Sequence, residues 1–200
     1  MENIERRNYA GPVNVVGEDE KRTVEGYALL FDTPSDGLSF TEVIERGALD
    51  GVIEKSNIFA LLNHDQSRGI LARSKNGIGT LSLTIDDLGL KYRFEAPRTA
   101  LGDELLEYLR RGEVSESSFA FTVLPKNETW EQISDDVWKR TIHKFDALYD
   151  VSPVYDAAYS ATSVNLRGKD EAQAAMLKAQ QEKKMELEQY YSSINQSINI

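Results

Sequence analysis

Short stretches in which hydrophobic and polar residues alternate run along most of the chain as far as residue 166 and predict an antiparallel β core. These stretches are 23–31, 69–73, 80–85, 90–96, 138–145, 148–154 and 161–166. The apolar run 58–62 ends in Asn63, His64 and Asp65, which predicts a buried strand that carries a polar tip. A helix is expected over 101–111, because leucines recur there at helical spacing and Gly112 follows.

A second, shorter helix is expected to begin after Ser39. Ser39 and Glu42 have the spacing of a capping box, and Val43 and Ile44 begin an apolar face behind it. Residues 125–136 are polar and are expected to form a loop.

Three parts of the chain are expected. Residues 1–22 are polar and mostly charged, which indicates an N-terminal arm that is mobile or pairs with a sheet edge. Residues 23–167 form the main domain. Residues 168–200 are rich in Ala, Gln, Lys and Glu with a thin apolar stripe, which indicates a partly disordered helical tail. The predicted class is α+β, mainly antiparallel β.

The composition narrows the function classes. The chain has 200 residues, 40% hydrophobic and 28% charged, which fits one domain with appendages. No run approaches the roughly 18 apolar residues of a membrane span, and the N-terminus lacks a secretory core, so no membrane partner is expected. The net charge of −10 argues against a nucleic-acid partner. The absence of cysteine excludes disulfides and thiolate chemistry.

Two histidines limit any mechanism that needs an imidazole to His64 or His143. Histidine is suited to take and return a proton near neutral pH. His143 lies in an alternating stretch where a solvent-facing side chain is expected. His64 follows a buried strand, where it is either a general base or a loop residue that only forms hydrogen bonds.

The chain passes from a helix end into a strand over 110–123, and this strand offers a candidate nucleophile. Phe119 and Phe121 face one side of the expected strand and Ser118 faces the other. A serine nucleophile needs a base, and a third group that orients the base.

Asp146 and Asp150 on a later strand could orient the imidazole of His64. Asp65 is a poor candidate, because neighbouring strand residues point to opposite faces. A metal site made from His64, Asp65 and His143 is the alternative, but the chain lacks His-Glu-x-x-His spacing. It also lacks a nucleotide fingerprint, so neither a metal nor a cofactor is expected.

Several segments, taken in order, resemble a known family. They are Asn-His-Asp at 63–65, Arg-Gly-Glu-Val-Ser-Glu-Ser-Ser-Phe-Ala-Phe at 111–121, and Leu-Tyr-Asp-Val-Ser-Pro-Val at 148–154 followed by Ala-Ala-Tyr at 157–159. With Val-Glu-Gly-Tyr-Ala at 24–28 and Glu-Val-Ile-Glu-Arg-Gly-Ala-Leu at 42–49, they resemble the prohead maturation proteases of tailed bacteriophages over roughly residues 20–165. The family usually has Gly at Ala120, and commonly Glu near Asp150.

The resemblance implies a serine endopeptidase domain over 23–167, in which Ser118 is the nucleophile and His64 the base. Ser117 is a rival nucleophile that should face the other side of its strand. Because these enzymes resemble the herpesvirus assemblins, it also implies an assemblin-like β barrel flanked by helices. By the same likeness Asp146 is the preferred third catalytic residue, with Asp150 as the alternative.

The resemblance further implies the partners. The substrates would be the scaffold segment of the major capsid protein, other internal head proteins and the protease itself, inside the assembling procapsid in the host cytoplasm. The helical tail would dock the enzyme to scaffold or be trimmed by self-cleavage, and a homo-oligomer is left open. A different class also stays open: a non-catalytic scaffold or head-assembly protein that retains the fold.

Overall fold

The computed structural model describes residues 4–9, 13–16, 22–35, 38–135 and 137–155, with residues 173–175, 177–179, 181, 182 and 185 of the tail. The chain divides into two compact units, Met1–Thr162 and Ser163–Ile200. The described residues of the second unit are helical and exposed. The strand expected over 161–166 lies outside the described residues. No helix within the described ranges is long and apolar enough to cross a membrane.

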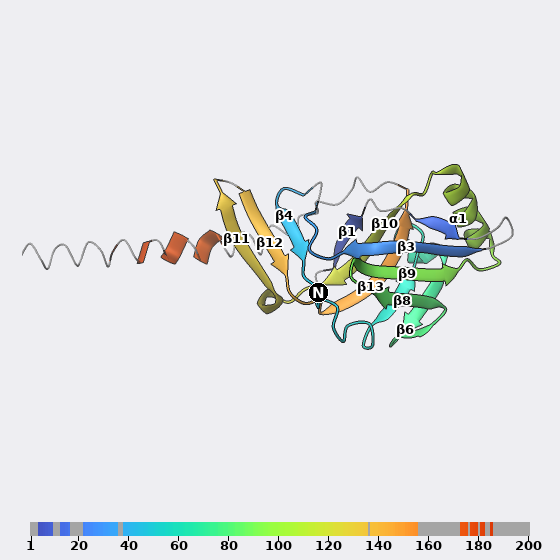
Figure 1. Cartoon of the computed structure of the whole chain (residues 1–200), viewed down its shortest axis with the longest axis horizontal. Coiled ribbons are helices and arrows are strands. Elements are labelled where there is room, and N and C mark those ends of the chain that lie inside the picture. The colour runs from blue at the N-terminus through green and yellow to red at the C-terminus, as the bar shows by residue number, and fades with distance from the viewer. Residues whose placement is uncertain are drawn as a thin grey trace, which may run out of the picture. The chain divides into compact units, whose positions relative to one another are not determined.

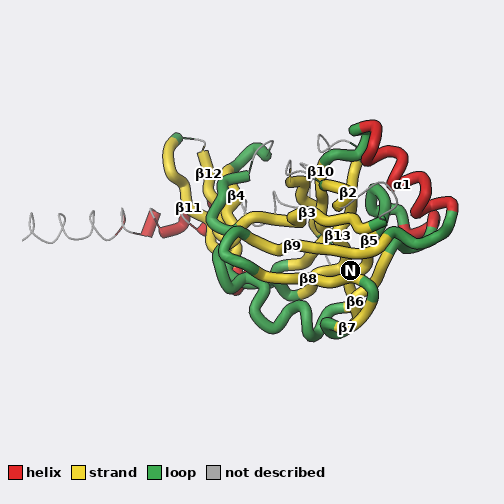
Figure 2. Tube along the Cα trace, turned by 45° about the vertical axis from the view of Figure 1, so that its right-hand side comes forward, coloured by secondary structure: helices red, strands yellow, loops and turns green. Residues whose placement is uncertain are grey.

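The described residues of the first unit form three sheets (Figures 1 and 2). The largest has the order β1 (Glu5–Tyr9), β10 (Glu116–Thr122), β13 (Ala147–Val154), β5 (Asn57–Ala60), β6 (Ala72–Lys75) and β7 (Ile78–Gly79). The second has the order β2 (Asn14–Val16), β3 (Thr23–Leu30), β9 (Gly89–Glu95) and β8 (Leu81–Ile85). The third has the order β11 (Glu128–Ser134), β12 (Val137–Ile142) and β4 (Thr41–Ile44).

Most neighbouring strands in these sheets are antiparallel, which confirms the predicted mainly antiparallel β class. The pairs β13–β5 and β12–β4 are parallel. The strand pairings of the described residues leave each sheet open. The assemblin-like barrel therefore stays a prediction.

The two faces of β10 have different surroundings, and this difference positions the candidate site. Phe119 and Phe121 lie on one face, where both stack with Phe145 in the hydrophobic core. Tyr92 of β9 reaches the same face and shares a hydrogen bond of 2.8 Å with Ser117. The four-stranded sheet thus packs on this face of the six-stranded sheet, and alternation turns Ser118 to the other face.

Helix α1 (Ala100–Arg111) forms where the leucine spacing predicts it, at one end of the sheets (Figure 2). Thr99 caps its start by accepting a hydrogen bond from the backbone N–H of Gly102. Leu105 and Leu106 are buried in the core. Gly112 ends the helix in the left-handed conformation, with φ of 74°, and the chain then enters β10.

Two local predictions are wrong. Residues 41–44 form strand β4 instead of a helix start, because β12 supplies a parallel partner and Thr41, Val43 and Ile44 are β-branched. The polar segment 125–136 contains the 3-10 turn η2 (Pro125–Asn127) and strand β11, which pairs with β12. The partner of β4 is distant in the sequence, whereas β11 itself has a polar composition that conceals a strand.

The N-terminal segment takes part in two sheets. β1 pairs with the edge of β10, and β2 pairs with β3. Of the two roles expected for residues 1–22, edge pairing describes these strands.

A buried cluster of charges joins β1 to the three-stranded sheet. Arg7 contacts Glu5 at 2.7 Å and Glu42 at 2.6 Å, and Arg140 contacts Glu42 at 2.8 Å and Glu5 at 2.6 Å. All four residues are buried, and Glu128 adds a further carboxylate beside Arg140. Burial alone would raise the pKa of Glu42, but Arg7 and Arg140 outweigh it and hold that pKa below its ordinary value of 4.5.

Glu42→Gln is expected to lower the free energy of unfolding by about 3–5 kcal/mol at pH 7, because two buried guanidinium groups lose a shared carboxylate. Since the folded pKa is depressed, this stabilisation is present above about pH 4.5 and is lost as the pH falls through the folded pKa. Urea unfolding across this pH range measures both effects. Arg46→Gln, which removes an exposed ion pair with Asp32, should cost much less. Equal losses in the two variants would contradict the prediction.

Candidate active site

Ser118 lies in the middle of β10, between β1 and β13. Its register partners are Asn8 on β1 and Ser152 on β13. Ser118 is fully buried, and its hydroxyl lies 2.9 Å from the backbone carbonyl oxygen of Arg7. The hydroxyl therefore lies on one face of the six-stranded sheet and contacts the backbone of the edge strand β1.

His64 reaches Ser118 from the loop that follows β5. Asn63 and His64 both have left-handed backbone conformations, with φ of 55° and 60°. Such residues are held in place by their surroundings, and here the N–H of Asn63 donates to the carbonyl of Pro153 on β13 at 2.9 Å. The turn directs the ring over β10, where Nε2 lies 2.5 Å from Oγ of Ser118.

Asp150 completes the contact on the other side of the ring. Its Oδ1 lies 2.6 Å from Nδ1 of His64, and the hydroxyl of Ser152 donates to the same oxygen at 2.7 Å. Both Asp150 and Ser152 are buried on β13. Ser152 was missed in the sequence, although a residue two positions after Asp150 on a strand shares its face.

Asp146, the preferred third residue, lies away from this arrangement. It is exposed just before β13, and its N–H donates to the carbonyl of Thr122 at 2.8 Å. A register shift between Ala120 and Phe121 pairs Asp150 with Ala120 and Leu148 with Phe121. This bulge breaks the regular alternation that would have put both aspartates on one face.

The other sequence candidates lie elsewhere. Ser117 faces the core and shares a hydrogen bond with Tyr92; burial raises the pKa of Tyr92, although this hydrogen bond opposes the change. Asp65 caps the 3-10 turn η1 (Gln66–Arg68), and its hydrogen bonds with Ser67 lower its pKa. His143 contacts Glu45 and Thr129.

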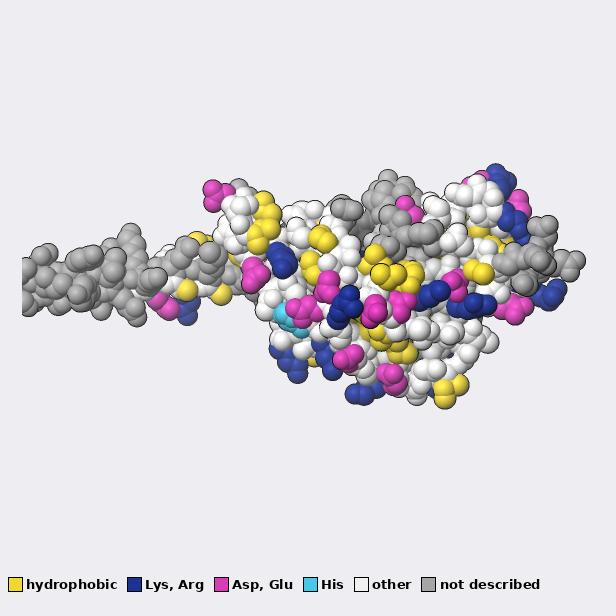
Figure 3. Space-filling view, viewed as in Figure 1, with side chains coloured by type: hydrophobic (Ala, Val, Ile, Leu, Met, Phe, Trp, Pro, Cys, Tyr) yellow, Lys and Arg dark blue, Asp and Glu magenta, His cyan; other side chains and the backbone are white. Residues whose placement is uncertain are grey.

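No group of His, Asp and Glu side chains suited to a metal ion occurs in the part of the chain that the structure describes. The alternative metal site of His64, Asp65 and His143 is accordingly not assembled there. On the face drawn in Figure 3, acidic and basic side chains are interspersed over the sheets, with no large region of one sign.

The single proton of the Ser118 hydroxyl has two competing acceptors. It can go to Nε2 of His64 or to the carbonyl of Arg7. If Ser118 donates to Arg7, then Nε2 must donate to Ser118. Nε2 then has no lone pair free to accept the Ser118 proton. His64 can act as a base only when the Ser118 hydroxyl donates to Nε2 and not to the Arg7 carbonyl.

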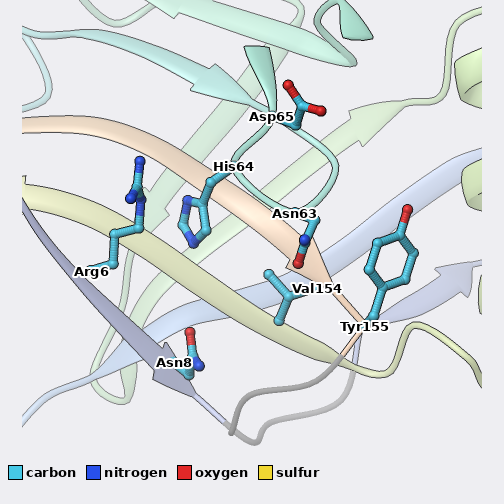
Figure 4. Close-up of a pocket in the computed structure, with 7 residues that line it drawn as sticks. All are labelled: Arg6, Asn8, Asn63, His64, Asp65, Val154 and Tyr155. Carbon is cyan, nitrogen blue, oxygen red and sulfur yellow. The ribbon is translucent and has the colours of Figure 1, made fainter. Parts of the chain in front are cut away.

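A pocket of about 500 Å³ opens beside the His64 ring. β1 forms one wall, the turn after β5 another, and the end of β13 a third, while Asp65 points away from the ring (Figure 4). The lining residues are Arg6, Asn8, Asn63, His64, Asp65, Val154 and Tyr155. Ser118 is not among them.

A buried serine, a histidine and an aspartate in line on a mainly β fold are the arrangement of a serine hydrolase. Comparison with protein-family models defines a narrower class of serine hydrolase. The family model described as Caudovirus prohead serine protease matches residues 11–178. The chain belongs to this family of phage prohead serine proteases.

The chain was also compared with solved structures and with curated proteins. Among solved structures, the chain is similar to the bacteriophage T4 capsid assembly protease, gp21, at 11% sequence identity. The match covers 76% of this chain and 98% of that one, with a TM-score of 0.48. The comparison with curated proteins found no match.

Proposed function

We propose that Ser118, His64 and Asp150 are the catalytic residues of this prohead protease. The observation that carries the proposal is the pair of short contacts made by one imidazole, 2.5 Å to Oγ of Ser118 and 2.6 Å to Oδ1 of Asp150. Asp146 is exposed before β13, and Asp150 takes this role in the proposal.

In the proposed reaction, Oγ of Ser118 attacks the scissile carbonyl while Nε2 of His64 accepts the hydroxyl proton. A bond forms between Oγ and the carbonyl carbon. His64 then gives the proton to the departing amine as the peptide bond breaks, which leaves an acyl-enzyme. Water, deprotonated by the same imidazole, hydrolyses this ester and restores Ser118.

Asp150 holds Nδ1–H and stabilises the imidazolium that forms at each proton transfer. Its buried position strengthens this interaction, because water does not screen it well. Ser152 keeps the carboxylate oriented through its own hydrogen bond to Oδ1.

The proposed substrates are the scaffold segment of the major capsid protein, other internal head proteins and the protease chain itself. The proposed place is the assembling procapsid in the host cytoplasm. Enclosure there would raise the effective concentration of substrate, so that tight binding is not required.

Incubation of the purified chain with the capsid precursor of its phage tests this function. Cleavage is expected, with loss of activity after treatment with a fluorophosphonate and full activity in the presence of EDTA, because the proposed nucleophile is a serine and no metal takes part. Mass spectrometry of the products measures the cleavage, and a phosphonyl adduct should map to Ser118. Inhibition by EDTA would support a metal mechanism instead. A complete lack of cleavage would favour the non-catalytic assembly protein.

A further inference from the structure

The edge strand β1 closes off the nucleophile. Ser118 is fully buried, and its hydroxyl donates a hydrogen bond of 2.9 Å to the backbone carbonyl of Arg7 on β1. A scissile carbonyl has to come to about 3–3.5 Å from a nucleophile before reaction. The Arg7 carbonyl of β1 therefore occupies space beside the Ser118 hydroxyl, within the distance that a scissile carbonyl has to reach.

β1 is also the kind of element that a substrate can replace. It lies at the end of the six-stranded sheet and pairs antiparallel with β10, with Asn8 opposite Ser118. Extended peptides bind by adding a strand to a free sheet edge. The part of the chain matched by the family model begins at residue 11, so β1 precedes it.

We propose that β1 occupies the substrate's place, and that an extended polypeptide substrate pairs with the edge of β10 after β1 has left it. This inference rests on the proposed function of Ser118. With β1 in place, the Ser118 proton is shared with the Arg7 carbonyl and the enzyme is latent. With β1 displaced, the hydroxyl donates to His64, and the substrate carbonyl takes the vacated position.

The buried charges hold β1 without fixing it permanently. Glu5 and Arg7 leave with β1 as a pair of opposite charges, 2.7 Å apart. Glu42 and Arg140 remain in contact with each other at 2.8 Å. Departure of β1 thus leaves no isolated buried charge, whose cost would prevent opening.

A reversible cross-link tests the proposal. Arg6 on β1 lies opposite Ala120 on β10, and directly opposed residues of antiparallel strands come close enough for a disulfide. Because the chain has no cysteine, the double variant Arg6→Cys with Ala120→Cys can form only this intramolecular bond. The rate at which a fluorophosphonate labels Ser118 is measured for oxidised and reduced protein. The wild type, treated identically, and the two single cysteine variants are the controls.

Labelling should be slowed at least about tenfold in the oxidised protein and recover on reduction, since the bond opposes release of β1. A second variant, Glu5→Gln with Arg7→Gln, keeps the Glu42–Arg140 pair and should label at least about threefold faster than wild type. Equal rates in oxidised and reduced protein, or slower labelling of the second variant, would show that β1 is a permanent wall of the pocket and overturn this inference alone. Failure of every protein to label Ser118 would overturn the proposed function with it.

Discussion

Ser118→Ala should abolish cleavage of the capsid precursor, with a fall in kcat of about 10⁶-fold. Loss of the nucleophile from such a triad removes nearly all of its contribution at once, because the three groups act as a unit. The residual rate would come from substrate binding and electrostatic stabilisation alone. Single-turnover cleavage of the precursor, followed by gel and mass spectrometry, covers the required range.

Ser117→Ala is the matched control. Ser117 is the neighbouring buried serine, but its hydroxyl faces the core and binds Tyr92. Its removal should lower stability, since the Tyr92 hydroxyl loses its partner, and should leave kcat within a few-fold. Folding of both variants is checked by urea unfolding. Retention of activity in Ser118→Ala with loss in Ser117→Ala would make Ser117 the nucleophile.

Much of the fold could be predicted from local patterns. The alternation at 90–96 and the leucine spacing at 101–111 correspond to β9 and α1, because all the residues that form each pattern belong to a single strand or helix. β4 was missed for the opposite reason. Its segment has a helix-start signature, and its strand conformation depends on hydrogen bonds from β12, which lies about 100 residues later.

The candidate site shows the same division between local and distant information. His64 and Ser118 could be selected because each has a recognisable local context. His64 belongs to a polar segment that follows a buried apolar run, and Ser118 lies on the face of a strand opposite two phenylalanines. In the structure, Nε2 of His64 lies 2.5 Å from Oγ of Ser118. The hydrogen bond from Ser118 to Arg7 could not be predicted, since the acceptor is a backbone carbonyl and carries no side-chain signal.

Strand β1 therefore contributes both to the stability of the fold and to the hydrogen bonding of Ser118. The charges of Glu5 and Arg7 are buried against Glu42, which fixes β1 on the edge of β10. The backbone of β1, fixed in this way, then competes with His64 for the Ser118 proton. For this reason, a substitution at Glu42 that lowers the free energy of unfolding is also expected to change the rate at which Ser118 reacts.

Asp150→Asn should lower kcat by about 10⁴-fold with little change in KM, the size of effect known when the aspartate of a Ser-His-Asp triad becomes an amide. An amide cannot stabilise the imidazolium by charge. Where its NH₂ group turns toward Nδ1, it also favours the tautomer whose Nε2 carries hydrogen and cannot accept the Ser118 proton. Steady-state cleavage of the precursor, compared at equal folded concentration, measures the fall.

Asp146→Asn is the control that separates the two aspartates named from the sequence. Asp146 is exposed before β13, and the bulge opposite Ala120 and Phe121 removes it from the face that carries Asp150. Its amide variant should keep kcat within about twofold, because surface substitutions away from a site change little. The reverse result, an active Asp150→Asn and an inactive Asp146→Asn, would mean that the register of β13 differs in the working enzyme. β13 would then have to slide along β10 by four residues to bring Asp146 to His64, because the two aspartates are four positions apart and each strand residue advances the chain by about 3.3 Å.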